Sequence, residues 1–258
     1  MKIIDNEEKL DEQGNSIMLY GRSKVGKTTS GLLYAPDPVM WIVTEVTRDV
    51  KQTLKNVKEI SGRTVGKEIF VAYHEDFLST LEFLINAENF KNVQSILLDS
   101  LTYLMNVLLV QEVVDEGFET KGEADKKKGK DIKDWTKVSA PNIGTVNQAI
   151  FRVNRALGQL TKSGKTLVTI CGEDDSPRFD TALFAGPALA FKEVPTNIPY
   201  SYDYIGRITP RKDKDGLIIY PPNVSFEEGN GYLAGWTGGG GKNRSGTVEQ
   251  FFKKFAKK

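Results

Sequence analysis

The feature that most constrains this chain is a glycine-rich loop close to its amino end. Residues 21–29 read GRSKVGKTT and match the phosphate-loop pattern G-x-x-x-x-G-K-[ST]. The apolar run Ser16–Tyr20 before the loop suits a strand, and Thr28–Tyr34 after it suits the start of a helix. A strand, a glycine-rich turn and a helix are the setting that this loop requires, so the sequence predicts a phosphate-binding site here.

The chemistry of phosphate binding explains the spacing within the loop. Glycines let the backbone curl so that successive N–H groups point at a phosphate, and the helix N-terminus adds favourable partial charge. We expect Lys27 to reach the β- and γ-phosphates and Thr28 to hold Mg²⁺. The candidate contact residues are Gly21, Arg22, Ser23, Lys24, Val25, Gly26, Lys27, Thr28 and Thr29.

Composition narrows the class of protein. The chain has 258 residues and a net charge of +1, so any nucleic-acid contact must come from local patches. The single cysteine, Cys171, excludes an internal disulfide and a cysteine-based zinc site, and it fits a reducing compartment. The amino end lacks a signal-peptide pattern, and the most apolar run, 95–110, carries Asp99 and is too short to span a bilayer. We therefore expect a cytoplasmic protein without a membrane segment.

Short apolar runs alternate with amphipathic segments up to residue 171. This pattern predicts an α/β fold with a mostly parallel central sheet that helices cover on both faces. The expected strands are Ser16–Tyr20, Val39–Val43, Glu68–Ala72, Val93–Leu98 and Thr166–Cys171. Three helices are expected. The first is capped by Asp76 and has Phe77, Leu81, Leu84 and Ile85 on one face, and the second runs from Leu101 to Glu116. The third runs from Gly144 to Ser163 and has apolar residues at helical spacing: Val146, Ile150, Val153, Leu157 and Leu160.

The character of the sequence changes after residue 172, where proline and glycine become frequent. Tyr202–Ile208 and Leu217–Tyr220 predict an antiparallel hairpin, and Thr247–Gln250 is a capping box that opens a last helix bearing Phe251, Phe252 and Phe255. The predicted organisation is a polar lead-in over 1–15, a core over 16–247 with a charged insert at about 117–141, and a short basic helix over 248–258.

A second nucleotide motif follows the loop by about seventy residues. Ile96–Leu98 is an apolar strand that ends in Asp99, the Walker B form, in which the acid lies beside the Mg²⁺ site. The next residue is Ser100 rather than a water-activating Glu, so the base lies elsewhere or hydrolysis is absent. Glu45, directly beyond the strand Val39–Val43, is the best candidate for the base, with a solvated loop acid as the alternative.

Taken together, these motifs resemble the RecA-type core. Asp99-Ser100 is similar to the end of the Walker B strand in RecA-like ATPases, and Glu45 matches the position of their catalytic Glu. Residues 242–246, KNRSG, are similar to the KNRFG of RadA and the Lys-x-Arg of DnaB-type helicases, with Ser245 in place of Phe. The resemblance implies a homo-oligomer, a ring or a filament, in which Lys242 and Arg244 act on the ATP of a neighbouring subunit. The alternative is a surface loop with two solvated cations.

The compact layout over 16–247 also resembles phage-encoded ATP-binding proteins of the RecA superfamily, one group of which are single-strand annealing recombinases. The supporting residues are the phosphate loop, DSLT at 99–102 and YDYIGR at 202–207. The resemblance implies an ATPase that acts on single-stranded DNA in phage recombination or replication in the bacterial host cytoplasm, with a single-strand-binding protein as a further partner. The compact layout leaves annealing, strand exchange and unwinding open.

In RecA-like proteins two loops contact DNA, and by position these would be 117–141 and 172–186 here. Lysines neutralise phosphates and an aromatic ring stacks on a base, which makes these loops candidates for DNA contact. The candidate residues are Lys126, Lys127, Lys128, Lys130, Trp135 and Arg178. Interspersed acids leave a solvated charged loop as an equal alternative. For the whole chain, the rival functions are a nucleotide-gated assembly protein without DNA activity and a P-loop kinase.

Overall fold

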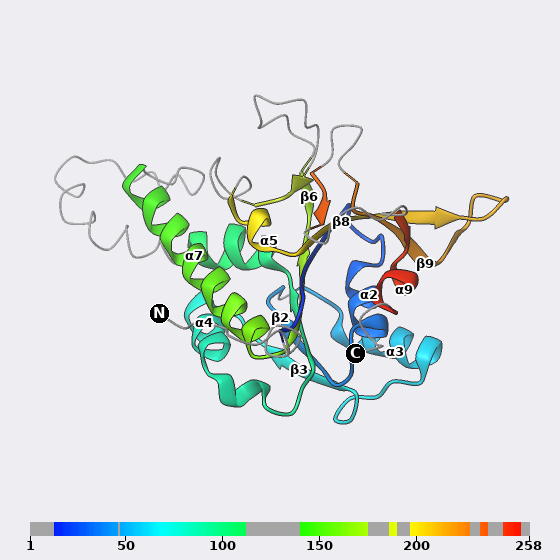
Figure 1. Cartoon of the computed structure of the whole chain (residues 1–258), viewed down its shortest axis with the longest axis horizontal. Coiled ribbons are helices and arrows are strands. Elements are labelled where there is room, and N and C mark those ends of the chain that lie inside the picture. Colours follow the sequence, from blue (N-terminus) through cyan, green and yellow to red (C-terminus); the bar gives the residue numbers. More distant parts are fainter. Residues whose placement is uncertain are drawn as a thin grey trace, which may run out of the picture.

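A large sheet runs through the middle of the molecule (Figure 1). The computed structural model describes residues 13–45, 47–111, 140–174, 186–189, 197–227, 233–236 and 245–253. Within these ranges the sheet has nine strands: β1 (Ser16–Tyr20), β2 (Val39–Val43), β3 (Ile69–Tyr73), β4 (Ser95–Asp99), β5 (Thr166–Cys171), β8 (Tyr204–Lys212), β9 (Ile218–Ser225), β10 (Gly235–Trp236) and β11 (Ser245–Thr247). The short strands β6 (Glu173–Asp174) and β7 (Gly186–Pro187) pair separately.

The strand order is β11-β9-β8-β1-β5-β4-β2-β3, with β10 beside β8. The six strands from β8 to β3 are parallel to their neighbours, whereas β9, β10 and β11 pair antiparallel. The protein is therefore α/β with a mostly parallel central sheet and an antiparallel region from the later part of the chain, as the sequence predicts.

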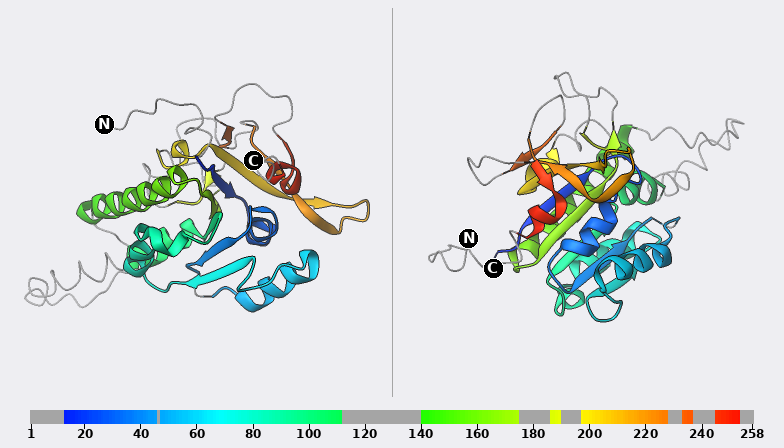
Figure 2. Two further views of the ribbon diagram at one scale, coloured as in Figure 1. Left: turned by 60° about the horizontal axis from the view of Figure 1, so that its bottom comes forward. Right: turned by 90° about the vertical axis from the view of Figure 1, so that its right-hand side faces the viewer.

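Helices cover both faces of the sheet (Figures 1 and 2). On one face lie α2 (Lys27–Tyr34), α3 (Val50–Ser61) and α9 (Val248–Phe252). On the other lie α4 (Phe77–Ile85), α5 (Leu101–Tyr103) with the π-helical turn η2 (Leu104–Leu109), and α7 (Ala140–Lys162). The 3₁₀ turns are η1 (Ala87–Phe90) and η4 (Pro199–Ser201). No helix in the described ranges combines the length and apolarity needed to cross a bilayer.

The strand β1 shows why these strands are continuous apolar runs. Its five residues are all buried, and because side chains alternate between faces, Met18 and Tyr20 pack into one core cluster while Ile17 and Leu19 pack into the other. A strand with helices on both sides has no solvent face, so it needs apolar side chains at every position.

Most predicted elements are confirmed within one or two residues, and β1, β2 and β5 have the predicted bounds. The helix predicted from Gly144 begins earlier, at Ala140. The prediction that Ile85 shares the core face of α4 is wrong, since its exposed fraction is 63%. It follows Leu84, which is buried, by one residue, and one residue turns a helix by about 100°. Phe255 and residues 112–116 lie outside the described residues.

The helix α3 has no counterpart in the predictions. It begins after Asp49, whose side chain accepts a hydrogen bond from the Gln52 backbone N–H, and it ends at Gly62, where φ is 77°. Val57 is buried, and Val50 and Leu54 pack against the same core, so the apolar period of an amphipathic helix is present in the sequence and the prediction missed it.

The buried face of α7 generates the first prediction. Replacing Ile150, which is fully buried between α7 and the sheet, with Ala should lower the free energy of unfolding by about 2–5 kcal/mol, because it removes apolar contact and leaves a cavity. The exposed Gln148 on the same helix provides the matched control, Gln148→Ala. Urea denaturation followed by circular dichroism measures both, and equal losses would contradict this packing.

Candidate functional site

The candidate site is a cleft at the carboxyl edge of the parallel strands. Its volume is about 1180 Å³, and it is lined by the phosphate loop and by residues that follow β2, β4 and β5. Because β2 and β4 are neighbours with Val43 opposite Asp99, the residues just beyond both strands meet at one place. The lining includes Arg22, Ser23, Lys24, Gly26, Lys27, Thr28, Thr29, Glu45, Arg48, Ser100 and Glu173.

The phosphate loop is held from outside by β9. The phenol of Tyr220 donates to the Gly26 carbonyl oxygen at 2.8 Å and lies 3.1 Å from Ser30 Oγ, and burial raises the pKa of Tyr220 to about 12. At Gly26 φ is 90°, and a Cβ there would lie 2.7 Å from the Tyr220 hydroxyl. Glycine is required at this position both by its backbone conformation and by the approach of β9.

Lys27 is the first residue of α2 and folds back over the loop. Its Nζ donates to the carbonyl oxygens of Gly21 and Arg22, each at 2.7 Å. Burial lowers the pKa of Lys27, and the negative charge of Asp99 opposes that shift. The ammonium group therefore lies in a partly desolvated place, where its attraction for a phosphate is strengthened.

The carboxylate of Asp99, at the end of β4, is fully buried. Its Oδ2 accepts hydrogen bonds from Thr28 Oγ1 at 2.9 Å and from Trp41 Nε1 at 3.2 Å. Its Oδ1 lies 3.2 Å from Arg48 Nη2 and accepts no hydrogen bond from the residues that the structure describes. Burial raises the pKa of Asp99, and the charge of Arg48 opposes this shift.

Arg48 joins the predicted metal ligands to the predicted base. Its Nη1 donates to Thr28 Oγ1 at 2.9 Å, and its Nη2 donates to Glu45 and lies 3.2 Å from Asp99. Thr28, Asp99 and Glu45 are thus brought together, and Lys27 lies beside Thr28 at the start of α2.

A buried carboxylate also lies two residues beyond β5, at the start of β6. Glu173 accepts two hydrogen bonds from Arg207 on β8, at 2.8 and 3.0 Å, and its Oε1 lies 3.6 Å from Nε of Arg22 in the phosphate loop. Only 2% of the Glu173 side chain is exposed. The ion pair therefore ties the phosphate loop to both strands that flank β1.

Not all of the candidate residues are among the residues that the structure describes. Those outside the described residues are Lys126, Lys127, Lys128, Lys130, Trp135, Arg178, Lys242 and Arg244. Conversely, sequence reasoning missed Trp41, Arg48, Arg207 and Tyr220 as site residues. The one available signal was the spacing of Arg48 three residues after Glu45 in a loop beyond a strand; the other three lie in strands and contact the site through their pairing.

The oxygen atoms at the site suit magnesium. The described residues contain no cluster of three or more His, Cys, Asp or Glu side chains placed to hold a metal ion. Magnesium, however, is usually bound by one or two protein oxygens together with phosphates and water. Thr28 Oγ1 and the buried Asp99 carboxylate, 2.9 Å apart, are such a pair.

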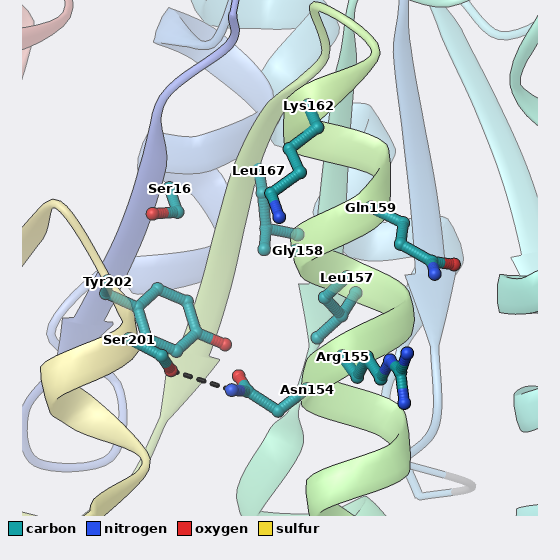
Figure 3. Close-up of a pocket in the computed structure, with 10 residues that line it drawn as sticks. All are labelled: Ser16, Asn154, Arg155, Leu157, Gly158, Gln159, Lys162, Leu167, Ser201 and Tyr202. Atoms are coloured by element: carbon teal, nitrogen blue, oxygen red, sulfur yellow. Dashed lines mark hydrogen bonds between the residues drawn. The ribbon is translucent and has the colours of Figure 1, made fainter. Parts of the chain in front are cut away.

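A second cavity, of about 320 Å³, lies at the opposite, amino-terminal edge of the strands (Figure 3). It is bounded by α7, the start of β1 and η4, and Asn154 Nδ2 donates to Ser201 Oγ across it at 2.7 Å. It is remote from the phosphate loop, and the charged side chains on its rim, Arg155 and Lys162, belong to exposed residues of α7.

Comparison with known proteins adds no assignment. No protein-family model matches the sequence, and no curated protein matches it either. The case for function therefore rests on the residues of the cleft.

The hydrogen bond from Trp41 to Asp99 generates the second prediction. Trp41→Phe keeps an aromatic ring but removes the indole N–H, and it should lower the free energy of unfolding by about 1–3 kcal/mol because a buried carboxylate loses a donor. The matched control is the same change in an Asp99→Asn background, where that loss should be smaller. Urea denaturation of the four proteins measures the coupling, and strictly additive effects would contradict it.

Proposed function

We propose that this chain is a magnesium-dependent ATPase with a RecA-like core, which works as a homo-oligomer on single-stranded DNA in phage recombination or replication. One observation carries the proposal: the phosphate loop and Glu45 line one cleft, and the buried Asp99 at the end of β4 contacts Thr28 and Arg48 of that lining. A phosphate loop alone supports nucleotide binding, but the acids on adjacent strands supply what hydrolysis needs.

The binding step uses the loop and the start of α2. Backbone N–H groups of the loop and the helix N-terminus would contact the phosphates, and the Lys27 ammonium would exchange its bonds to Gly21 and Arg22 for phosphate oxygens. Thr28 and Asp99 would hold Mg²⁺, which when bound neutralises charge on the β- and γ-phosphates. The absence of an Asn-Lys-x-Asp motif from the sequence supports ATP over GTP.

The hydrolytic step requires a water molecule in line with the γ-phosphate. Glu45 would orient this water and accept its proton as the oxygen–phosphorus bond to water forms and the bond to the β-phosphate oxygen breaks. The position of Glu45, two residues beyond Val43, which pairs with Asp99, supports this role. Glu173 lies at the start of β6, just beyond β5, and would report the presence of the terminal phosphate through Arg22.

Two further parts of the proposal rest on the resemblance to RecA-like proteins. Lys242 and Arg244 would complete the ATP site of a neighbouring subunit, and the charged loops 117–141 and 172–186 would contact DNA. If Lys242 and Arg244 of a neighbouring subunit complete the ATP site, hydrolysis takes place only in the oligomer. ATP binding would then control how tightly the oligomer binds DNA.

The third prediction separates binding from turnover. Lys27→Ala should lose most ATP affinity because the phosphates lose their main cation, whereas Glu45→Gln should keep ATP affinity and lose turnover by roughly 10²–10⁴-fold. Glu59→Gln, at an exposed acid on α3, is the matched control and should resemble the wild type. Calorimetry with Mg·ATP and phosphate-release assays measure both steps. Wild-type turnover in Glu45→Gln would exclude Glu45 as the base, and full affinity in Lys27→Ala would exclude the loop assignment.

The fourth prediction concerns action in trans. Arg244→Ala subunits keep an intact phosphate loop, and Lys27→Ala subunits keep an intact Arg244, so mixing two inactive proteins should restore part of the ATPase activity. Single-stranded DNA should raise the rate of the wild type. Absence of rescue at every mixing ratio would argue against a shared site, and indifference to DNA would favour a nucleotide-gated assembly protein.

A further inference from the structure

A guanidinium group lies at the point where the oxygens of the candidate site converge. Arg48 Nη1 is 2.9 Å from Thr28 Oγ1, and Nη2 is 3.2 Å from Asp99 Oδ1 and donates to Glu45 Oε2. These oxygens come from the start of α2, the end of β4 and the loop after β2. One cation thus joins three elements that are far apart in the sequence.

The same oxygens are those that a divalent cation would use. Magnesium needs oxygen ligands at about 2.0–2.1 Å in octahedral geometry, and the proposed function assigns it to Thr28 and Asp99. A metal ion on Thr28 Oγ1 would lie beside the guanidinium group that donates to the same oxygen, and two cations at this separation would repel each other.

We propose that Arg48 is an internal substitute for the metal: it neutralises Asp99 and positions Thr28 and Glu45 until magnesium-nucleotide displaces it. This inference rests on the proposed magnesium site and adds a regulatory step to it. While the guanidinium holds Glu45, the base is engaged in an ion pair, so the catalytic groups are released only when metal and nucleotide enter together.

The local backbone allows this exchange to be a side-chain movement. The Arg48 backbone N–H donates to the Glu45 carbonyl oxygen at 3.0 Å, and the following residue, Asp49, caps α3 through the Gln52 N–H at 2.8 Å. Both ends of the segment are therefore fixed, while the Arg48 side chain is 24% exposed and lines the cleft. A rotated guanidinium stays in that cleft, where its planar fork fits phosphate oxygens.

The exchange has a measurable consequence for the metal dependence of nucleotide binding. Without a metal ion, the guanidinium supplies positive charge beside the phosphates and favours binding of free ATP. With magnesium, the same group must first leave Thr28 and Asp99, which opposes binding of Mg·ATP. Arg48 therefore lowers the ratio of ATP affinity in magnesium to ATP affinity in EDTA.

The test is calorimetric titration of ATP into the full chain, in magnesium and in EDTA. In Arg48→Gln the ratio of the two affinities should rise by roughly tenfold or more, since a charge-assisted bond of this kind contributes at least a factor of ten. Arg48→Lys keeps the positive charge but lacks the planar fork, so its affinity ratio should lie between those of Arg48→Gln and the wild type. This variant also provides the test if Arg48→Gln does not fold. Arg152→Gln, at an exposed arginine on α7, should keep the wild-type ratio.

A purely structural role for Arg48 would weaken binding equally in both conditions, so an unchanged or lower ratio overturns the inference. A second readout needs no nucleotide: Mn²⁺ titration followed by electron paramagnetic resonance. Manganese should bind Arg48→Gln roughly tenfold more tightly than the wild type, and adding Asp99→Asn should abolish the gain. Equal manganese affinity overturns the inference even where ATP binds. If the wild type fails to bind ATP but the manganese difference is present, the proposed function fails and the displacement at the metal position stands.

Discussion

The burial of a charged carboxylate at the end of β4 is the constraint on which the site depends. Asp99 is fully buried, and a buried charge is costly unless donors surround it. Two donors come from Thr28 at the start of α2 and from Trp41 in β2, and Arg48 beyond β2 supplies the opposite charge in an ion pair. None of these residues is adjacent to Asp99 in the sequence, so the carboxylate is satisfied only when the strand order and the phosphate loop are correct together.

The sheet supplies this register through its parallel core. Because Val43 pairs with Asp99, and β4 pairs with β5, the residues beyond the strands lie at one edge, where Thr44 and Ser100 also hydrogen-bond to each other. The antiparallel part of the sheet then fixes the loop from the other side, through Tyr220 on β9 and the ion pair of Arg207 on β8 with Glu173. The later third of the chain, which bears no part of the phosphate-loop motif, thus determines the shape of that loop.

The features of the fold and site that the sequence predicts are those that depend on local residues rather than on contacts between distant segments. The bounds of β1, β2 and β5 were predictable because a strand buried on both faces is apolar throughout. Gly26 and Lys27 stood out as candidate site residues because the phosphate-loop pattern has them in a fixed order. The helix α3 was equally open to prediction from the helical spacing of Val50, Leu54 and Val57 and from its cap Asp49, and it was missed. Arg48 left only the signal of its spacing from Glu45, and Tyr220 left none, since its role arises from the return of the hairpin to the loop, which a linear pattern does not contain.

Two of the cations that line the cleft, Lys27 and Arg48, donate to oxygens of the protein itself. Lys27 bonds two carbonyls of the loop, and Arg48 bonds Thr28 and the acids. In the proposed function a triphosphate would replace these existing bonds instead of binding to unpaired cations, which lowers the affinity for the triphosphate. The same bonds stabilise the bare site, because they offset the mutual repulsion of the two cations and the desolvation of Asp99. Nucleotide and metal together carry enough charge to take over both sets of bonds, whereas either one alone takes over part of them. On this argument the bonds that the bare site already holds set the affinity of the proposed site for the metal–nucleotide complex, and those of Arg48 reduce the preference for that complex over free ATP.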